Sequence, residues 1–246
     1  MDLITLDFET YYDKDFSLRK LTTEEYVRDP RFEVVGVGVK VNNGPTEWAS
    51  GTHNELQGYL DGFDWESSMV LAHNTMFDGA ILSWLFGVKP RVWADTLCIA
   101  RALHGVEVGG SLAALADRYG VGKKGDEILN AVAKRRLDFT DEELDKYGDY
   151  CINDVELTYK LFGLMGAGFP RQELKLIDRT LRMFIHPLLE LDTDLLEDHL
   201  HDTKKAKDKL LSDSGVEDKK ELMSNPKFAE MLKNLGVEPP MKTSLT

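Results

Sequence analysis

Asp7 and Glu9 follow the first apolar run of the chain, residues 3–6, and these two acids are the first candidates for functional residues. Because side chains alternate between the two faces of a strand, Asp7 and Glu9 point the same way and Phe8 points to the opposite face. Two carboxylates about 6–7 Å apart repel each other unless a positive charge lies between them. A divalent cation, bound by carboxylate oxygens, is the simplest such charge. The pair therefore predicts a metal site at the end of a strand.

Asp78 is a third acid that can reach this point. It follows the apolar run 69–72, which predicts a buried strand, and in open α/β sheets functional groups gather at the carboxyl ends of strands. Asp78 joins Asp7 and Glu9 if its strand runs parallel to the first. The alternative is an ordinary acid in the first turn of a helix, where the helix dipole favours negative charge.

Asp154 is a fourth acid, within a long predicted helix. Tyr150 precedes it by four residues, so both side chains occupy one face of that helix. The apolar stripe of the helix consists of Leu144, Tyr147, Cys151, Val155 and Phe162. Because Asp154 borders this stripe, it needs a partner, and a metal ion is a good one. The alternative is a half-exposed acid that is hydrogen-bonded to a neighbouring loop.

Apolar periodicity predicts the elements that would position these acids. Alternating or continuous apolar runs predict strands at 2–9, 32–41, 46–49, 69–72 and 91–94. Helical spacing and capping signals predict helices at 22–28, 53–60, 75–85, 95–104, 111–119 and 140–165. A meander followed by alternating strands and helices indicates an α/β fold with a mixed five-stranded sheet flanked by helices.

Glycines and Pro170 after the long helix predict a domain boundary. We expect one domain at 1–168 and an all-helical extension at 169–246. The extension is charged and poor in strand signals. Within it, helices are expected at 173–185, 193–211 and 218–235.

The composition suits a globular protein of one full domain with an extension, since 42% of the 246 residues are hydrophobic. No apolar run approaches the roughly 20 residues that span a bilayer, and no secretory signal is visible. We therefore expect a cytoplasmic protein without membrane contact. Cys98 and Cys151 are expected to be small buried thiols, because two isolated cysteines offer no thiolate metal site.

The net charge of −13 argues against a nucleic-acid-binding protein, which usually carries a basic surface. Bound cations, however, reverse the local field of the carboxylates that hold them. A protein that holds one strand end, or that is tethered to a larger partner, also needs fewer phosphate contacts than a groove reader. The charge therefore does not exclude a nucleic-acid substrate.

Taken together, the acidic motifs resemble those of the DEDD superfamily of 3′–5′ exonucleases, in the subgroup with a tyrosine in the third motif. Residues 7–10 resemble the first motif, Asn74–Asp78 the second and Tyr150–Asp154 the third. Further stretches that resemble phage family A DNA polymerases are Asp95-Thr96, Lys123-Lys124-Gly125, 177–184 and 189–192. The resemblance implies a ribonuclease-H-like fold for 1–168 and the start of a polymerase thumb region for 169–246.

The resemblance also implies a two-metal site. Asp7, Glu9 and Asp154 would hold one Mg²⁺ ion. Asp7 would bridge to a second Mg²⁺, which Asp78 reaches directly or through water, and Mn²⁺ is expected to substitute. Tyr150 would hydrogen-bond the attacking water. An unperturbed phenol titrates near pH 10, so Tyr150 is expected to orient this water, while the metal lowers the pKa of the water.

The candidates for binding the terminal nucleotides are Thr10, Asn74, Phe8 and Tyr11. Nucleobases stack on aromatic faces at about 1–3 kcal/mol each. For Tyr11 and its neighbour Tyr12, the alternative is simple packing within the loop. Basic residues between 91 and 136, Lys123 and Lys124 among them, either contact phosphates or form a solvated face. His73 is expected to be structural.

The function implied by the resemblance is a metal-dependent 3′–5′ exonuclease that releases nucleoside 5′-monophosphates from single-stranded DNA. The expected setting is proofreading in phage replication, in a bacterial or phage-infected cell, with a polymerase subunit or the remaining polymerase region as partner. The chain ends before any polymerase palm, so a truncated polymerase and a separately encoded subunit are both open. Two alternatives remain: an RNA-trimming exonuclease of the same superfamily, and a non-catalytic module that binds a DNA end or a polymerase.

Overall fold

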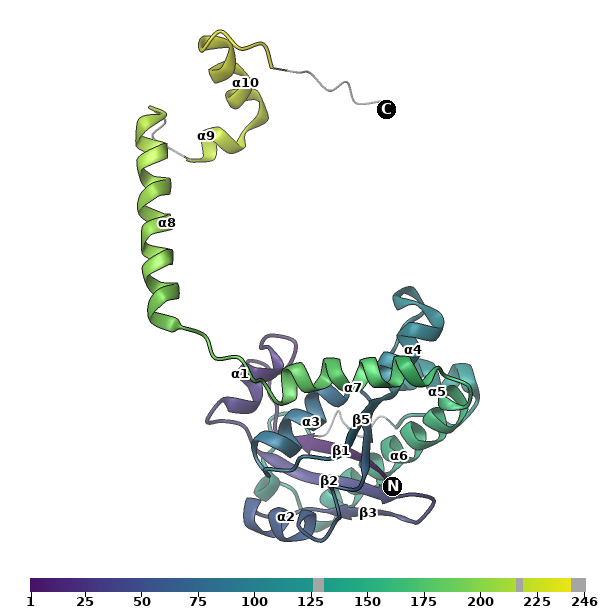
Figure 1. Ribbon diagram of the computed structural model, residues 1–246. Coiled ribbons are helices and arrows are strands. Elements are labelled where there is room, and N and C mark those ends of the chain that lie inside the picture. Colours follow the sequence, from purple (N-terminus) through teal and green to yellow (C-terminus); the bar gives the residue numbers. More distant parts are fainter. Residues whose placement is uncertain (126–130, 216–218, 240–246) are drawn as a thin grey trace. The chain divides into compact units, whose positions relative to one another are not determined.

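The computed structural model describes residues 1–125, 131–215 and 219–239. The chain divides into two compact units, Met1–Leu188 and Leu189–Thr246. The predicted acids all belong to the first unit, which is built on a mixed sheet (Figure 1).

The sheet has five strands in the order β3-β2-β1-β4-β5. The strands are β1 (Leu3–Thr10), β2 (Val34–Val41), β3 (Thr46–Ala49), β4 (Met69–Ala72) and β5 (Val92–Asp95). β1 lies at the centre, antiparallel to β2 and parallel to β4. The predicted mixed five-stranded sheet is confirmed, and so is the parallel pairing on which the position of Asp78 depends.

Helices flank this sheet (Figure 1). They are α1 (Thr23–Arg28), α2 (His53–Leu60), α3 (Thr75–Trp84), α4 (Thr96–His104), α5 (Leu112–Tyr119), α6 (Asp141–Gly166) and α7 (Arg171–Ile185). Short 3₁₀ turns are η1 (Val106–Val108) and η3 (Arg136–Asp138). Thr22, Thr52 and Thr140 begin their helices with capping boxes, in which threonine and a glutamate three residues later satisfy two backbone N–H groups.

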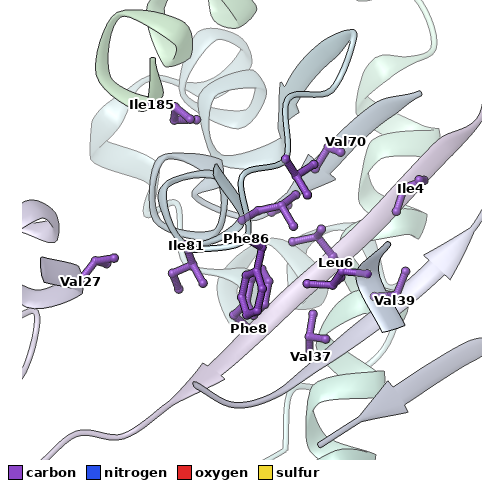
Figure 2. Close-up of a cluster of buried hydrophobic side chains, with 14 of the residues drawn as sticks. Ile4, Leu6, Phe8, Val27, Val37, Val39, Val70, Ile81, Phe86 and Ile185 are labelled. Atoms are coloured by element: carbon purple, nitrogen blue, oxygen red, sulfur yellow. The ribbon is translucent and has the colours of Figure 1, made fainter. Parts of the chain in front are cut away.

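One face of the sheet is covered by α3 and α7 through an apolar cluster (Figure 2). On β1, Ile4, Leu6 and Phe8 point into this cluster, as alternation predicts. Ile81 of α3 and Ile185 of α7 belong to the same cluster. Asp7 and Glu9 alternate with the apolar residues along β1, so their side chains point to the opposite face of the sheet, which α6 covers.

α6 crosses β1, β2 and β3 at close range because β2 carries glycine beneath it. Gly38 is the partner of Asp7 in the β1–β2 ladder. A Cβ atom at Gly38 would lie 2.9 Å from Sγ of Cys151 and 3.1 Å from Cγ2 of Val155, closer than side chains normally pack. The absence of a side chain at Gly38 thus lets α6 approach the acids of β1.

The first unit extends beyond the predicted boundary at 168, because α7 packs on α3 and β5. Leu181 and Ile185 of α7 are 3% and 1% exposed. Asp178 accepts a hydrogen bond from the backbone N–H of Trp93, at 2.8 Å, on the edge strand β5. The contacts thus divide the chain after Leu188, whereas the glycines and Pro170 indicated a boundary at 168, which stays a prediction.

The second unit is helical, as predicted, with α8 (Thr193–Asp213), α9 (Lys219–Met223) and α10 (Asn225–Asn234). The prediction of one helix over 218–235 is wrong. Pro226 lies in the first turn of α10, where its missing N–H is tolerated, whereas in a helix interior it would break the hydrogen-bond ladder. Among the described residues, no helix is both long and apolar enough to cross a bilayer.

Candidate active site

The acidic end of β1 extends past β4, its parallel neighbour. β4 pairs with β1 over Leu3–Thr5, whereas β2 stays paired with β1 as far as Thr10, with a register shift after Glu9. Beyond the end of β4, the backbone N–H of Phe8 donates to Oδ1 of Asp78 at 3.0 Å. This hydrogen bond fixes Asp78 of α3 beside the strand segment that carries Asp7 and Glu9.

The start of α3 is held in place by Asp95, at the end of β5. Asn74 adopts a left-handed conformation with φ of 75° as the chain turns from β4 into α3. Asp95 accepts hydrogen bonds from the backbone N–H groups of Asn74, at 3.1 Å, and Thr75, at 3.2 Å. Asp95 also caps α4, so one carboxylate joins two strand ends and two helices. Asp78, one turn into α3, is 2% exposed.

The face of α6 that points toward β1 carries Tyr147, Tyr150, Cys151 and Asp154, all buried. The Cys151 thiol donates to the carbonyl oxygen of Asp7 at 3.3 Å. Ligand atoms of Asp7, Glu9 and Cys151 lie within 4.8 Å of one another. α6 therefore brings Asp154 to the same place as the acids of β1 and α3.

Burial and mutual repulsion act together on these carboxyl groups. Burial, and next the charge of Asp154, raise the pKa of Asp7 to about 7. Burial, and next the charge of Asp7, raise the pKa values of Glu9 and Asp78 well above their usual range. The structure thus brings the four predicted acids into one electrostatic cluster, with Asp7 at its centre.

The two tyrosines of the α6 face stay protonated in this environment. Burial and the charge of Asp154 raise the pKa of Tyr150. Burial and the charge of Glu9 likewise raise the pKa of Tyr147. From the sequence, Tyr147 was expected only as part of the apolar stripe, although its spacing of three residues from Tyr150 and seven from Asp154 indicates the same helix face. Its position beside Glu9 was missed.

Lys124 is the other residue whose position sequence reasoning did not anticipate. Its ammonium group forms an ion pair with Oδ2 of Asp154 and lies 4.8 Å from the centre of the Tyr150 ring. From the sequence, Lys124 was expected either to contact phosphate or to belong to a solvated face. Nothing in the sequence indicated the ion pair with Asp154, because the two residues come from separate segments.

A cavity of about 630 Å³ opens beside Glu9. Its lining residues are Phe8, Glu9, Thr10, Tyr12, Asp13, Lys14, Ser17, Leu18, Arg19, Tyr26, Phe77, Val132 and Tyr147. Of the predicted nucleotide-binding residues, Phe8 and Thr10 line this cavity, whereas Tyr11 and Asn74 do not. The Tyr11 hydroxyl donates to Asp13 at 2.7 Å, and its ring lies 4.2 Å from the Arg135 guanidinium.

The donor set fits a divalent cation. Carboxylate oxygens are the ligands that Mg²⁺ binds, and buried acids that repel one another need positive charge nearby. Asp7, Glu9, Asp78 and Asp154 meet both conditions, because each is partly or fully buried within the same cluster. The arrangement can therefore bind a hard metal ion next to the cavity that Glu9 lines.

The fold of this chain is similar to that of known proteins. No family model and no curated protein matches the sequence. Brucella melitensis NrnC, in a structure with bound Mg²⁺, is 14% identical, with a TM-score of 0.52 over 74% of this chain and 81% of that chain. NrnC bound to pGG gives a TM-score of 0.53 with the same identity and coverage.

A second similar protein is Trypanosoma brucei RNase D. Its complex with RNA U12 is 14% identical to this chain, with a TM-score of 0.53 over 77% of this chain and 66% of that chain. At this identity the likeness concerns the fold. With the sheet order described above, it confirms the predicted ribonuclease-H-like fold.

Proposed function

We propose that this protein is a metal-dependent 3′–5′ exonuclease that releases nucleoside 5′-monophosphates from the 3′ end of single-stranded DNA. The observation that carries the proposal is the meeting of acids from β1, α3 and α6 in one buried cluster beside a cavity. Structural roles alone rarely collect so many like charges, because burying them together is unfavourable. The fold shared with NrnC and RNase D supports the same class of activity.

In this proposal Asp7, Glu9, Asp78 and Asp154 hold Mg²⁺. The bound metal supplies Lewis acidity and lowers the pKa of a coordinated water. Tyr150 keeps its proton, since its pKa is raised, so its hydroxyl donates a hydrogen bond and orients the water rather than accepting a proton. The raised pKa thereby supports the orienting role predicted from the sequence.

The cavity beside Glu9 is the proposed site for the terminal nucleotide. Its volume of about 630 Å³ lies within the range of small-molecule pockets. Tyr12 and Phe77 offer aromatic faces for a base, and Arg19 offers positive charge for a phosphate. Tyr12 thus replaces Tyr11 as the proposed aromatic contact.

The test is a nuclease assay on a 5′-labelled single-stranded DNA oligonucleotide, with and without Mg²⁺. We expect a ladder of products shortened from the 3′ end, mononucleotide release, and loss of both in chelator and in Asp7→Ala. A 3′-phosphorylated or 3′-blocked oligonucleotide controls for cleavage within the strand. Metal-dependent binding of the oligonucleotide without any cleavage would favour the non-catalytic module and reject the enzyme.

RNA is the second candidate substrate, and the bound molecule of one similar structure favours it. The RNase D structure is a complex with RNA U12. The four acids do not discriminate between DNA and RNA, because they contact the phosphodiester. Turnover on DNA and RNA oligonucleotides of matched sequence and length decides between them, and a faster reaction with RNA would overturn the DNA assignment.

The proposal extends to proofreading alongside a phage family A polymerase, on the motifs that resemble those enzymes. Proofreading requires frayed ends to react faster than paired ends. We therefore expect faster removal of a mismatched 3′-terminal nucleotide than of a matched one in a primer–template duplex. Equal rates on the two duplexes would argue against this setting while leaving the exonuclease itself in place.

A further inference from the structure

Lys124 brings a positive charge into the acidic cluster. Its ion pair with Asp154 is largely removed from solvent, with exposed fractions of 29% for the lysine side chain and 5% for the aspartate. The Tyr150 ring lies beneath the ammonium group, at 4.8 Å, and adds a cation–π contact. Because charges interact more strongly away from water, this pair is of greater consequence than an exposed salt bridge.

The charge of Lys124 also acts on the acids of β1. It lowers the pKa values of Asp7 and Glu9, against the larger upward effect of burial. Asp7, Glu9 and Asp154 are the acids expected to hold one metal ion together. The Lys124 ammonium therefore lies among the ligands of that ion, and both cations compete for the same carboxylates.

The backbone before Lys124 is anchored to α6, the helix that carries Asp154. Nδ2 of Asn153 donates to the carbonyl oxygen of Lys123 at 3.0 Å. Gly122, with φ of 146°, passes so close to α6 that a Cβ atom there would lie 2.9 Å from Cδ2 of Leu157. The segment is thus built to deliver Lys124 to the site.

We propose that Lys124 is a resident counter-ion: it holds the acidic cluster together in the metal-free protein and leaves Asp154 when a divalent cation binds. This inference rests on the proposed function, because it needs the metal site. Lys124 is a positioning residue here, and its ion pair sets how much Mg²⁺ the site requires.

Competition between Lys124 and Mg²⁺ for the carboxylates predicts how removal of Lys124 changes stability and metal affinity. Removing the counter-ion leaves the buried acids without its charge, so the metal-free protein loses stability. Removing the competitor also frees Asp154 for the metal, so the affinity for Mg²⁺ rises. If Lys124 had only a structural role, its removal would lower the stability of the metal-free protein without raising the affinity for Mg²⁺. The Mg²⁺ affinity is therefore the deciding measurement.

The test uses the full chain without nucleic acid, in wild type, Lys124→Met and Lys124→Arg. Thermal unfolding in chelator measures metal-free stability, and calorimetric titration with Mg²⁺ measures affinity. In Lys124→Met we expect a lower unfolding temperature and Mg²⁺ binding at least about fivefold tighter than in wild type. Lys124→Arg keeps the positive charge and is expected to restore both values toward wild type.

Lys123→Met is the matched control. Its side chain is exposed, and its contact with Asn153 is made by the backbone carbonyl, which the substitution retains. We expect both measurements to stay at the wild-type values. A rise in Mg²⁺ affinity in Lys123→Met as large as in Lys124→Met would show that general surface charge, rather than the ion pair with Asp154, is responsible.

A measurement on wild type covers the case in which Lys124→Met does not fold. An amine-acylating reagent, followed by mass spectrometry, reports the reactivity of Lys124 relative to Lys123. We expect the acylation rate of Lys124 to rise when Mg²⁺ saturates the site, because the ammonium group leaves its carboxylate. Lys124 reactivity that stays constant or falls on Mg²⁺ binding would overturn the proposal.

Failure of this inference is distinguishable from failure of the proposed function. Mg²⁺ binding to wild type that Lys124→Met leaves unchanged or weakens rejects the counter-ion and keeps the metal site. Absence of Mg²⁺ binding in every variant rejects both.

Discussion

Asp7 is the acid on which the other carboxylates converge. Its charge contributes to the raised pKa values of Glu9 and Asp78, and the charge of Asp154 raises its own. Its backbone carbonyl receives the Cys151 thiol of α6. Asp7 therefore lies at the centre of the proposed metal site, whereas Tyr150 lies on one side of this site, on α6.

This difference predicts unequal losses of activity in Asp7→Ala and Tyr150→Phe. Removing a metal ligand withdraws charge stabilisation from the reaction and should lower kcat by about 10³-fold. Removing an orienting hydroxyl should lower it by roughly 10–100-fold. The measurement is turnover of a single-stranded oligonucleotide at saturating Mg²⁺, with circular dichroism to confirm folding. Equal losses would show that the Tyr150 hydroxyl does more than orient water.

His73 fits the structural role expected from the sequence. Its Nε2 lies 2.9 Å from the carbonyl oxygen of Gly110, which can only accept, so Nε2 carries a proton. Its Nδ1 lies 2.8 Å from Oγ1 of Thr96 at the start of α4. In the neutral ring, Nδ1 accepts from that hydroxyl. His73 thus connects the end of β4 to α4 and to the loop before α5.

Burial of this ring predicts a pH dependence of stability. Burial lowers the pKa of His73 below its usual value of about 6.5. Between the folded and unfolded pKa values the unfolded chain binds more protons, so stability is lost as the pH falls below about 6.5. Chemical denaturation of wild type and His73→Gln across this pH range measures the effect. We expect wild type to lose its advantage over the variant at low pH; a constant difference would contradict the prediction.

At the scale of elements, the site depends on how closely α6 approaches β1 and β2. Gly38→Ala places a methyl group against Cys151 and Val155 of α6. Such overpacking costs typically about 1–3 kcal/mol and displaces the helix that carries Tyr150 and Asp154. We expect a lower unfolding temperature and reduced exonuclease activity.

Gly163→Ala is the matched control for Gly38→Ala, because it adds the same methyl group to α6 itself at an exposed position with nothing within 4 Å. It should be neutral or stabilising, since alanine favours helix by up to about 1 kcal/mol over glycine. Cys151→Ala should rescue part of the Gly38→Ala loss by making room. Stability of Gly38→Ala equal to wild type would show that α6 does not require the glycine.

Local patterns predicted most of these elements, and long-range contacts decided the rest. The turn at 42–45 and the apolar run 69–72 predicted β3 and β4 with the bounds they have. Strand ends likewise predicted that Asp7, Glu9 and Asp78 meet, and the apolar stripe of α6 predicted the partner that Asp154 needs, while the roles of these acids stay predictions. The sequence did not predict which aromatic residue of the loop after β1 lines the cavity. The position of Tyr12 depends on a long-range contact, because its carbonyl oxygen accepts a hydrogen bond from the N–H of Ala133 at 2.8 Å.

At the scale of the whole molecule, α7 shows why the compact unit that contains the sheet extends to Leu188. An edge strand such as β5 leaves backbone groups unpaired unless something covers them. Asp178 accepts the N–H of Trp93, and Arg182 donates to the carbonyl of Arg91 at 2.8 Å. The helix that follows Pro170 therefore completes the sheet of the first unit.

Two shortened chains test this division. A chain of residues 1–188 keeps α7 on β5 and should unfold at a temperature close to that of the full chain, with exonuclease activity. A chain of residues 1–168 loses the burial of Leu181 and Ile185, worth about 1.5–3 kcal/mol each, out of a total stability of only about 5–15 kcal/mol. It should unfold at a markedly lower temperature or aggregate. Equal unfolding temperatures for the two chains would support the predicted boundary at 168 and show that α7 is dispensable to the sheet that holds the acids.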